Sequence, residues 1–275
     1  MTAITRSLLS SAALLLEWDK LGHCQKEDKL RLAFMGAFLH AREAHLLLIL
    51  LTEAPPPTDF DKRLDLSLLP SWPPDQEPEA AGEMKFFAKG CPTDYRTRIG
   101  RRLSDIHYVH SLASEGKLHG FFFDIVLDRK LVGKECYASL KEMCKLAANA
   151  LYNSANPIQP HQLKDSPGVK AFATAAIDHT PGKFRKLTKY GFIFPPMDLP
   201  GPKGGAKRGP AFVQSPKEEG LISIGVRKAG KEQVVRYRAF TSKDNVHGAV
   251  CFAVFEPNGS LAASTDDLMT ILAKR

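Results

Sequence analysis

The spacing of apolar residues near the N-terminus is helical. In the segments 3–16 and 27–52, apolar side chains recur every three or four residues, and neither segment contains proline. In the second segment the residues that share this face are Leu30, Phe34, Phe38, Ala41 and His45. The pattern predicts two helices, and we expect residues 1–52 to form a helical cap.

A proline-rich segment follows, over residues 53–82. Proline has a fixed φ and no backbone N–H, so this composition disfavours a continuous helix or a central strand. The apolar residues expected to anchor the segment to a neighbouring surface are Leu64, Leu66, Leu68, Leu69 and Trp72. We therefore predict a linker or a wrapping arm between the cap and the rest of the chain.

Residues 83–275 alternate between helical and extended patterns. Helical spacing predicts helices over 95–114, 134–152 and 264–275, and the last begins with capping-box spacing between Ser264 and Asp267. Apolar runs bounded by turn residues predict strands over 84–90, 118–128, 190–194, 220–228, 232–240 and 248–256. The predicted fold class is α+β: an N-terminal helical cap, then a mixed α/β body with a mainly antiparallel sheet in its last third.

The net charge of +8 is distributed unevenly. Residues 1–82 hold 8 Lys and Arg against 12 Asp and Glu, whereas residues 183–238 hold 13 against 4. Such a basic block is typical of a surface that binds a polyanion, most often nucleic acid, although a solvated surface has the same composition. The acidic first part predicts a separate contact, in which a protein partner binds an acidic N-terminal helical cap.

The segment 200–210, PGPKGGAKRGP, offers glycines and basic side chains but nothing apolar to bury. Glycine lets a backbone approach a ligand closely, and basic side chains suit phosphates, so we expect contact with a phosphate backbone; a solvated loop is the alternative. A P-loop is excluded because Arg208, and not Ser or Thr, follows Lys207. The predicted nucleic-acid-binding residues are Lys203, Lys207, Arg208, Arg227, Lys228, Arg236, Arg238, Arg98, Arg101 and Arg102.

Two histidines lie three residues apart on the predicted helix 95–114. Histidine titrates near neutrality, so a pair beside arginines can move a proton on and off a ribose 2′-hydroxyl without a metal. His107, His110 and the adjacent Tyr108 are therefore candidate catalytic residues of an endoribonuclease. A purely structural pair is the alternative interpretation.

The predicted strand 118–128 suggests a different chemistry. Asp124 and Asp128 alternate with apolar residues, Lys130 follows, and Asp94 or Asp105 is the upstream acid. This order resembles the PD-(D/E)xK pattern of metal-dependent nucleases, in which carboxylates hold a hard cation such as Mg²⁺ and a lysine assists the attacking water. Two aspartates on a solvated sheet face give the same sequence, so both interpretations stand.

A basic α+β chain with a Gly/Lys-rich loop ahead of its late strands is similar to the RAMP proteins of CRISPR systems. The matching elements are GPKGGAKRGP and the strands that follow it as far as Glu256. The resemblance implies ferredoxin-like units, a glycine-rich loop on the RNA backbone, and metal-independent cleavage of repeat RNA. The glycine spacing, the place of the loop and the helical N-terminus depart from the family pattern, so no residue beyond the loop is carried over.

Cysteine usage and apolar run lengths set further limits. Five scattered cysteines without a C-x-x-C pair predict neither disulfides nor a zinc ribbon, as is usual in a reducing cytoplasm. The apolar run 45–51 is too short to span a membrane. The sequence thus predicts a cytoplasmic RNA-binding protein that needs no cofactor and belongs to a ribonucleoprotein complex. Three alternatives stay open: the endoribonuclease, a non-enzymatic accessory protein with a basic docking face, and the metal-dependent nuclease.

Overall fold

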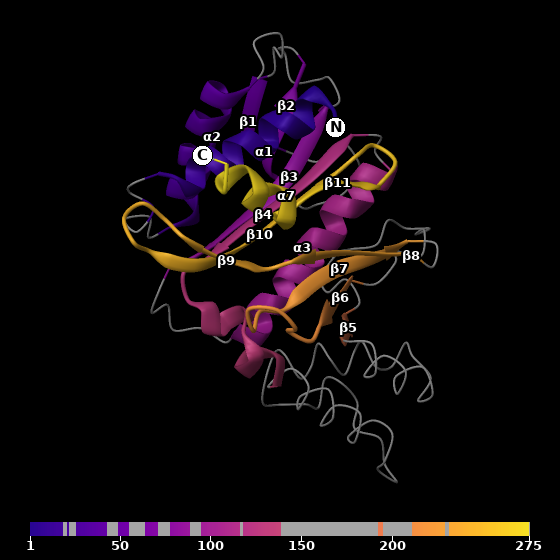
Figure 1. Ribbon diagram of the computed structural model, residues 1–275. Coiled ribbons are helices and arrows are strands. Elements are labelled where there is room, and N and C mark those ends of the chain that lie inside the picture. Colours follow the sequence, from indigo (N-terminus) through magenta and orange to yellow (C-terminus); the bar gives the residue numbers. More distant parts are fainter. Residues whose placement is uncertain are drawn as a thin grey trace.

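A long helix between two β-sheets organises the computed structural model (Figure 1). The structure describes residues 1–18, 21, 26–42, 49–54, 64–70, 78–88, 95–115, 118–138, 192–194, 211–228 and 231–274. It describes the backbone alone at 49–54, 95–101, 104, 192–194 and 227–228. Most of the predicted helix 134–152 and the whole of the segment 200–210 lie outside the described residues.

The larger sheet has seven strands. They are β1 (Ile49–Ala54), β2 (Leu64–Leu69), β3 (Ala80–Phe87), β4 (His119–Val126), β9 (Arg238–Thr241), β10 (His247–Phe255) and β11 (Leu261–Ser264). The order is β1-β2-β3-β4-β10, and the far edge of β10 is shared by β9 in its first half and β11 in its second. All neighbours are antiparallel except β3 and β4. Because parallel neighbours need a crossover connection, helix α3 (Tyr95–Glu115) joins them.

The second sheet packs on the other side of α3 (Figure 1). Its four antiparallel strands follow one another in the order β5 (Phe192–Phe194), β6 (Ala211–Gln214), β7 (Ser223–Lys228) and β8 (Lys231–Arg236). Alternate side chains, such as Ile224 and Val235, share one buried core with Leu103 and Ile106 of α3. A short 3-10 helix, η2 (Arg129–Val132), follows β4, and its Val132 carbonyl accepts from the N–H of Ile222 at 2.8 Å.

Three helices cover the opposite face of the larger sheet: α1 (Ala3–Leu16), α2 (Glu27–Ala41) and α7 (Thr265–Leu272) (Figure 1). Of the positions with helical spacing in α2, Leu30, Phe34 and Phe38 are buried, whereas His45 lies outside the described residues. Phe34 stacks on Phe121 of β4 with ring centroids 6.0 Å apart. Helix α7 begins with the predicted capping box between Ser264 and Asp267. The layers are therefore helices, large sheet, α3 and small sheet.

Three buried side chains join the inner layers at one point. Arg102 of α3 donates two hydrogen bonds to the carboxylate of Asp124 of β4, one of them from Nη2 at 3.1 Å. Tyr237, between β8 and β9, donates its hydroxyl to the same carboxylate at 2.5 Å. Burial alone lowers the pKa of Arg102, but the attraction of Asp124 outweighs it and the pKa lies above its usual value. Arg102 therefore stays charged inside the protein.

The α+β class and the mainly antiparallel sheets are confirmed. The predicted helix 27–52 is shorter: α2 ends at Ala41, and Ile49–Ala54 pairs with β2 because tertiary pairing outweighs the local helical pattern. The expected linker 53–82 contributes β2 and the start of β3, since the run Leu64–Leu69 contains no proline. A ferredoxin-like unit would place a strand between its two parallel strands, whereas β3 and β4 are direct neighbours. Within the described parts of the chain, no helix is long and apolar enough to cross a membrane.

The buried ion pair makes a prediction about stability. Asp124→Asn leaves the Arg102 charge buried without its counter-ion, so we expect the free energy of unfolding to fall by about 3–5 kcal/mol. Tyr237→Phe removes one hydrogen bond to the same carboxylate and is expected to cost about 1–3 kcal/mol. Urea unfolding followed by circular dichroism measures both. A loss below about 1 kcal/mol in Asp124→Asn would mean that water reaches Arg102.

Candidate active site

Four carboxylates and two cationic side chains meet where β2, β3, α2 and α3 come together. We call this group the acidic cluster: Glu27 and Arg31 of α2, Asp65 of β2, Glu83 and Lys85 of β3, and Asp105 of α3. The cluster thus draws on elements from both sides of the large sheet. Asp65, Glu83 and Asp105 are buried.

Lys85 lies at the centre of the acidic cluster. Its ammonium nitrogen is 2.9 Å from Glu83 Oε2 and 3.0 Å from Asp65 Oδ2. Carboxylate oxygens of Glu27 and Asp105 lie slightly farther away, at 3.7 and 3.8 Å. On the α2 side, Arg31 Nη2 is 2.5 Å from both Asp65 Oδ1 and Glu27 Oε1. Asp65 therefore links the lysine to the arginine.

The cluster forms where β2 and β3 stop pairing. Their ladder ends at Leu66–Gly82, and beyond it the N–H of Met84 donates to the carboxylate of Asp65 at 2.8 Å. Glu83 and Lys85, two residues apart, point to the same face of β3. Position 82, just before Glu83, requires glycine, because a Cβ on Gly82 would lie 2.1 Å from the backbone oxygen of Phe121. The strand geometry thus holds an Asp against a Glu-x-Lys segment.

Burial and charge act in opposite directions on the acidic cluster. Burial alone lowers the pKa of Lys85, but the carboxylates of Glu83, Asp105 and Asp65 outweigh it, so the pKa is raised and the lysine is charged. Burial raises the pKa of Glu27 above its usual value. The side chain of Glu83 is 1% exposed, whereas those of Lys85 and Glu27 are 21% and 30% exposed. The cluster therefore opens to solvent at Lys85 and Glu27.

The donor atoms of the cluster suit a hard cation. Carboxylate oxygens are the side-chain ligands that Mg²⁺ prefers, and the carboxylates outnumber the cationic side chains four to two. Among the described residues, no three His, Cys, Asp or Glu side chains already surround a common point as metal ligands do. The ammonium of Lys85 lies between the carboxylates instead. Asp65 and Glu83 are the residues that would hold a divalent cation.

The histidine pair proposed from the sequence as catalytic is buried in the structure. His107, Tyr108 and His110 are buried, with at most 4% of each residue exposed, because α3 is covered by a sheet on either side. The ring of His110 packs edge-on against Phe255 with centroids 5.1 Å apart, and Tyr108 packs in a small apolar cluster with Leu64. In this conformation an RNA strand cannot reach these side chains. The structure gives them a packing role.

The aspartates predicted on one solvated face of 118–128 are also separated. Asp124 is fully buried and bound to Arg102, so neither its carboxylate nor that guanidinium faces a ligand. Asp128 lies beyond the strand, where its carboxylate caps η2 by accepting from the N–H of Lys130 at 3.1 Å. Both faces of β4 are covered, which is why the alternation did not produce a solvated face. Asp124, Asp128 and Lys130 do not form one site.

Two of the predicted nucleic-acid-binding arginines border a polar hollow of about 370 Å³. Arg236 and Arg238 both donate to Glu218, and Arg238 also donates to Asp266 at 2.7 Å. Side chains of Glu218 and Asp266 are about half exposed or more, so these ion pairs contribute little stability. For Arg98, Arg101, Arg227 and Lys228 the structure gives the backbone positions in α3 and β7. Lys203, Lys207 and Arg208 lie outside the described residues.

The acidic cluster was not predicted from the sequence. The signal was present: an aspartate in the apolar run LDLSLL, then Glu-x-Lys at the start of the strand segment EMKFF. Asp65 lies in the segment interpreted as a linker, and Glu83 lies just before the predicted strand 84–90. Only the pairing of β2 with β3 brings the two together.

The central lysine makes a prediction that needs no substrate. Lys85→Met removes the charge that separates the carboxylates, so at neutral pH we expect the free energy of unfolding to fall by about 2–4 kcal/mol. Added Mg²⁺ or Ca²⁺ should raise the melting temperature of this variant more than that of the unaltered chain. Thermal unfolding with and without the cation measures both effects, with the exposed Lys130→Met as the matched control. A variant that is destabilised yet insensitive to either cation would contradict the assignment of a cation site.

Comparison with known proteins identifies no relative of the chain. A scan against models of protein families found no match, and searches of curated proteins and of solved structures found no similar protein.

Proposed function

We propose that the chain is a metal-dependent nuclease and that the acidic cluster is its active site. One observation carries the proposal: Asp65 of β2 lies against Glu83-x-Lys85 of β3, and the lysine is within 3.0 Å of both carboxylates. This is the order of acids and lysine in the PD-(D/E)xK pattern, at a place other than the one the sequence suggested. The framework of a helix, three antiparallel strands, a crossover helix and a strand parallel to the third also resembles that of such nucleases.

Each residue of the cluster has a chemical part in this proposal. A divalent cation held by Asp65 and Glu83 would polarise a phosphoryl oxygen and lower the pKa of a bound water. Lys85 is protonated among its carboxylates, so it donates a hydrogen bond to a water or a phosphate oxygen and stabilises developing negative charge. Glu27 is the most exposed of the four carboxylates around Lys85, and its raised pKa suits proton exchange.

The surroundings of the cluster support a nucleic acid as substrate. Arg101 and Arg98 precede Asp105 by four and seven residues in the sequence of α3. The basic block 183–238 supplies further positive charge in the same chain. Polyanion affinity arises mainly from such charge, without sequence readout. The proposal therefore retains the binding of RNA or another nucleic acid and adds hydrolysis to it.

Cleavage assays test the assignment of the active site. With single-stranded and duplex RNA and DNA as substrates, we expect hydrolysis in Mg²⁺ or Mn²⁺ and none in EDTA. Asp65→Asn, Glu83→Gln and Lys85→Met should each lower the rate by about 100-fold or more, because each removes a group that acts on the reacting phosphate. Asp128→Asn and Lys130→Met, which alter the alternative acid and lysine, serve as controls and should keep full activity. Cleavage that persists in EDTA, or in Asp65→Asn, would rule the proposal out.

A salt titration tests the predicted role of the glycine-rich loop in binding. Changing Lys203, Lys207 and Arg208 to Ala should weaken nucleic-acid binding and reduce the slope of log K against log salt by about 2 on single strands. The rate at saturating substrate should not change, because the loop is assigned to binding alone. A control variant replaces three exposed lysines elsewhere, Lys26, Lys29 and Lys274, and should retain the slope. An unchanged slope in the loop variant would remove the loop from the interface.

A further inference from the structure

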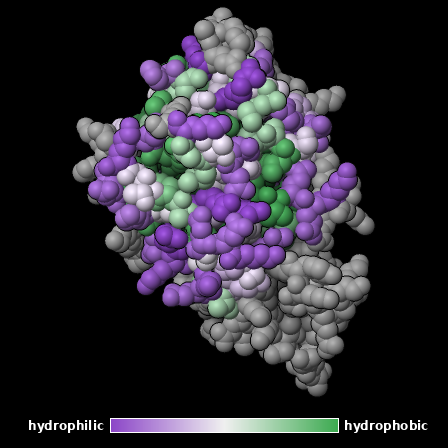
Figure 2. Space-filling view, in the orientation of Figure 1, coloured by the Kyte–Doolittle hydropathy of each residue, from purple (hydrophilic) through white to green (hydrophobic). Residues whose placement is uncertain are grey.

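Helix α2 is apolar on both of its sides. Leu30, Phe34 and Phe38 are buried against the large sheet, yet Leu32 and Leu39 on the opposite side are 66% and 57% exposed. In the face shown in Figure 2, apolar side chains reach the surface over the helical layer within a hydrophilic surround. Large apolar side chains gathered on one exposed face and surrounded by polar residues mark an interaction surface. The outer side of α2 therefore resembles an interface more than a solvated surface.

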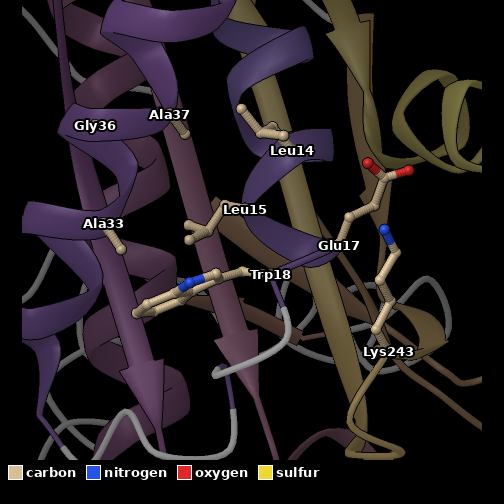
Figure 3. A pocket seen from close by; sticks show the side chains of 8 residues that line it. All are labelled: Leu14, Leu15, Glu17, Trp18, Ala33, Gly36, Ala37 and Lys243. Atoms are coloured by element: carbon tan, nitrogen blue, oxygen red, sulfur yellow. The ribbon is translucent and has the colours of Figure 1, made fainter.

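A groove runs beside this exposed ridge, between α1 and α2 (Figure 3). It encloses about 460 Å³, and the residues that line it are Leu14, Leu15, Glu17, Trp18, Ala33, Gly36, Ala37 and Lys243. Trp18 is 37% exposed at its border. A Cβ on Gly36 would meet nothing within 4 Å, so packing inside the chain does not require glycine there. Glycine in mid-helix destabilises the helix, and a close approach by another backbone is a reason to keep it.

We infer that this face is a self-association surface, on which a second copy of the chain packs its α2 antiparallel to the first beside Gly36. The ridge of Leu32 and Leu39 and the groove lie side by side on one face, so the ridge of each copy can enter the groove of the other. Such self-complementarity is the condition for a two-fold symmetric interface. Of the four large apolar side chains exposed among the described residues, three lie here: Trp18, Leu32 and Leu39.

Charge favours a second copy over a strongly charged partner. Residues 1–52 hold six Lys and Arg against five Asp and Glu, so the helical cap is nearly neutral; the prediction of an acidic cap was wrong, because the acidic excess lies in 53–82. In the antiparallel arrangement, Leu32 of one copy lies level with Leu39 of the other along the helix axes. Asp28 of one copy then lies near Arg42 of the other. The side chain of Asp28 is 79% exposed. Glu27 and Arg31 are directed away from this face, so the acidic cluster stays open.

The mass of the full chain in solution tests the inference directly. Size-exclusion chromatography with light scattering should give twice the chain mass of 30.3 kDa. Leu32→Glu combined with Leu39→Glu should give a monomer, whereas the exposed Lys274→Glu should remain a dimer. A monomer for the unaltered chain at about 100 μM, where a dimer of micromolar Kd is mostly formed, would overturn the inference. So would a double variant that stays dimeric.

Two further variants keep the test decisive if charges on α2 disturb folding. Gly36→Leu improves helix propensity and has open space in the single chain, so it should fold and yet be monomeric. Asp28→Arg and Arg42→Asp should each weaken the dimer, and the two together should restore it. Failure of the combined variant to recover the dimer would contradict the antiparallel arrangement. None of these measurements depends on nuclease activity.

Discussion

The position of α3 depends on one buried ion pair. Arg102 cannot be enclosed between two sheets unless its charge is balanced, and Asp124 of β4 balances it. Tyr237 donates a further hydrogen bond to the carboxylate of Asp124. The same contact fixes the rotation of α3 about its axis. One turn later along the helix, Asp105 is thereby directed toward Lys85 of β3. A purely apolar contact of equal area would hold the helix without fixing its rotation so closely.

The acidic cluster also depends on the local loss of pairing between β2 and β3. In a continuous β2–β3 ladder, backbone groups would bond to each other and the side chains of the two faces would stay apart. At Asp65 the side chain takes over the bond from Met84, which lets Arg31 from one side of the sheet and Lys85 from the other contact one carboxylate. Irregular strand pairing of this kind is common beside functional sites. Here it brings polar groups into a region that is otherwise apolar.

The local sequence pattern was sufficient to predict most of the helices and strands, but it was not sufficient to predict the acidic cluster. The helical spacing in α1, α2 and α3 and the apolar runs of β4 and β10 are properties of neighbouring residues, so the sequence reveals them. Whether a polar residue on such an element meets solvent depends on distant segments. The helix face of His107 and His110 looked accessible because the sequence does not show that a second sheet covers it. Arg102 and Asp124 each looked functional, and the fold pairs them with each other.

Two short strands protect β10, a strand of nine residues with the apolar sequence AVCFAVF. Its edge opposite β4 is covered by β9 over one half and by β11 over the other. An uncovered edge of this length and composition would invite pairing with other molecules. Both covering strands are close to β10 along the chain, one just before it and one just after it. Each half of the edge can therefore be covered as soon as its neighbour has been synthesised, which shortens the time during which the chain is exposed to aggregation.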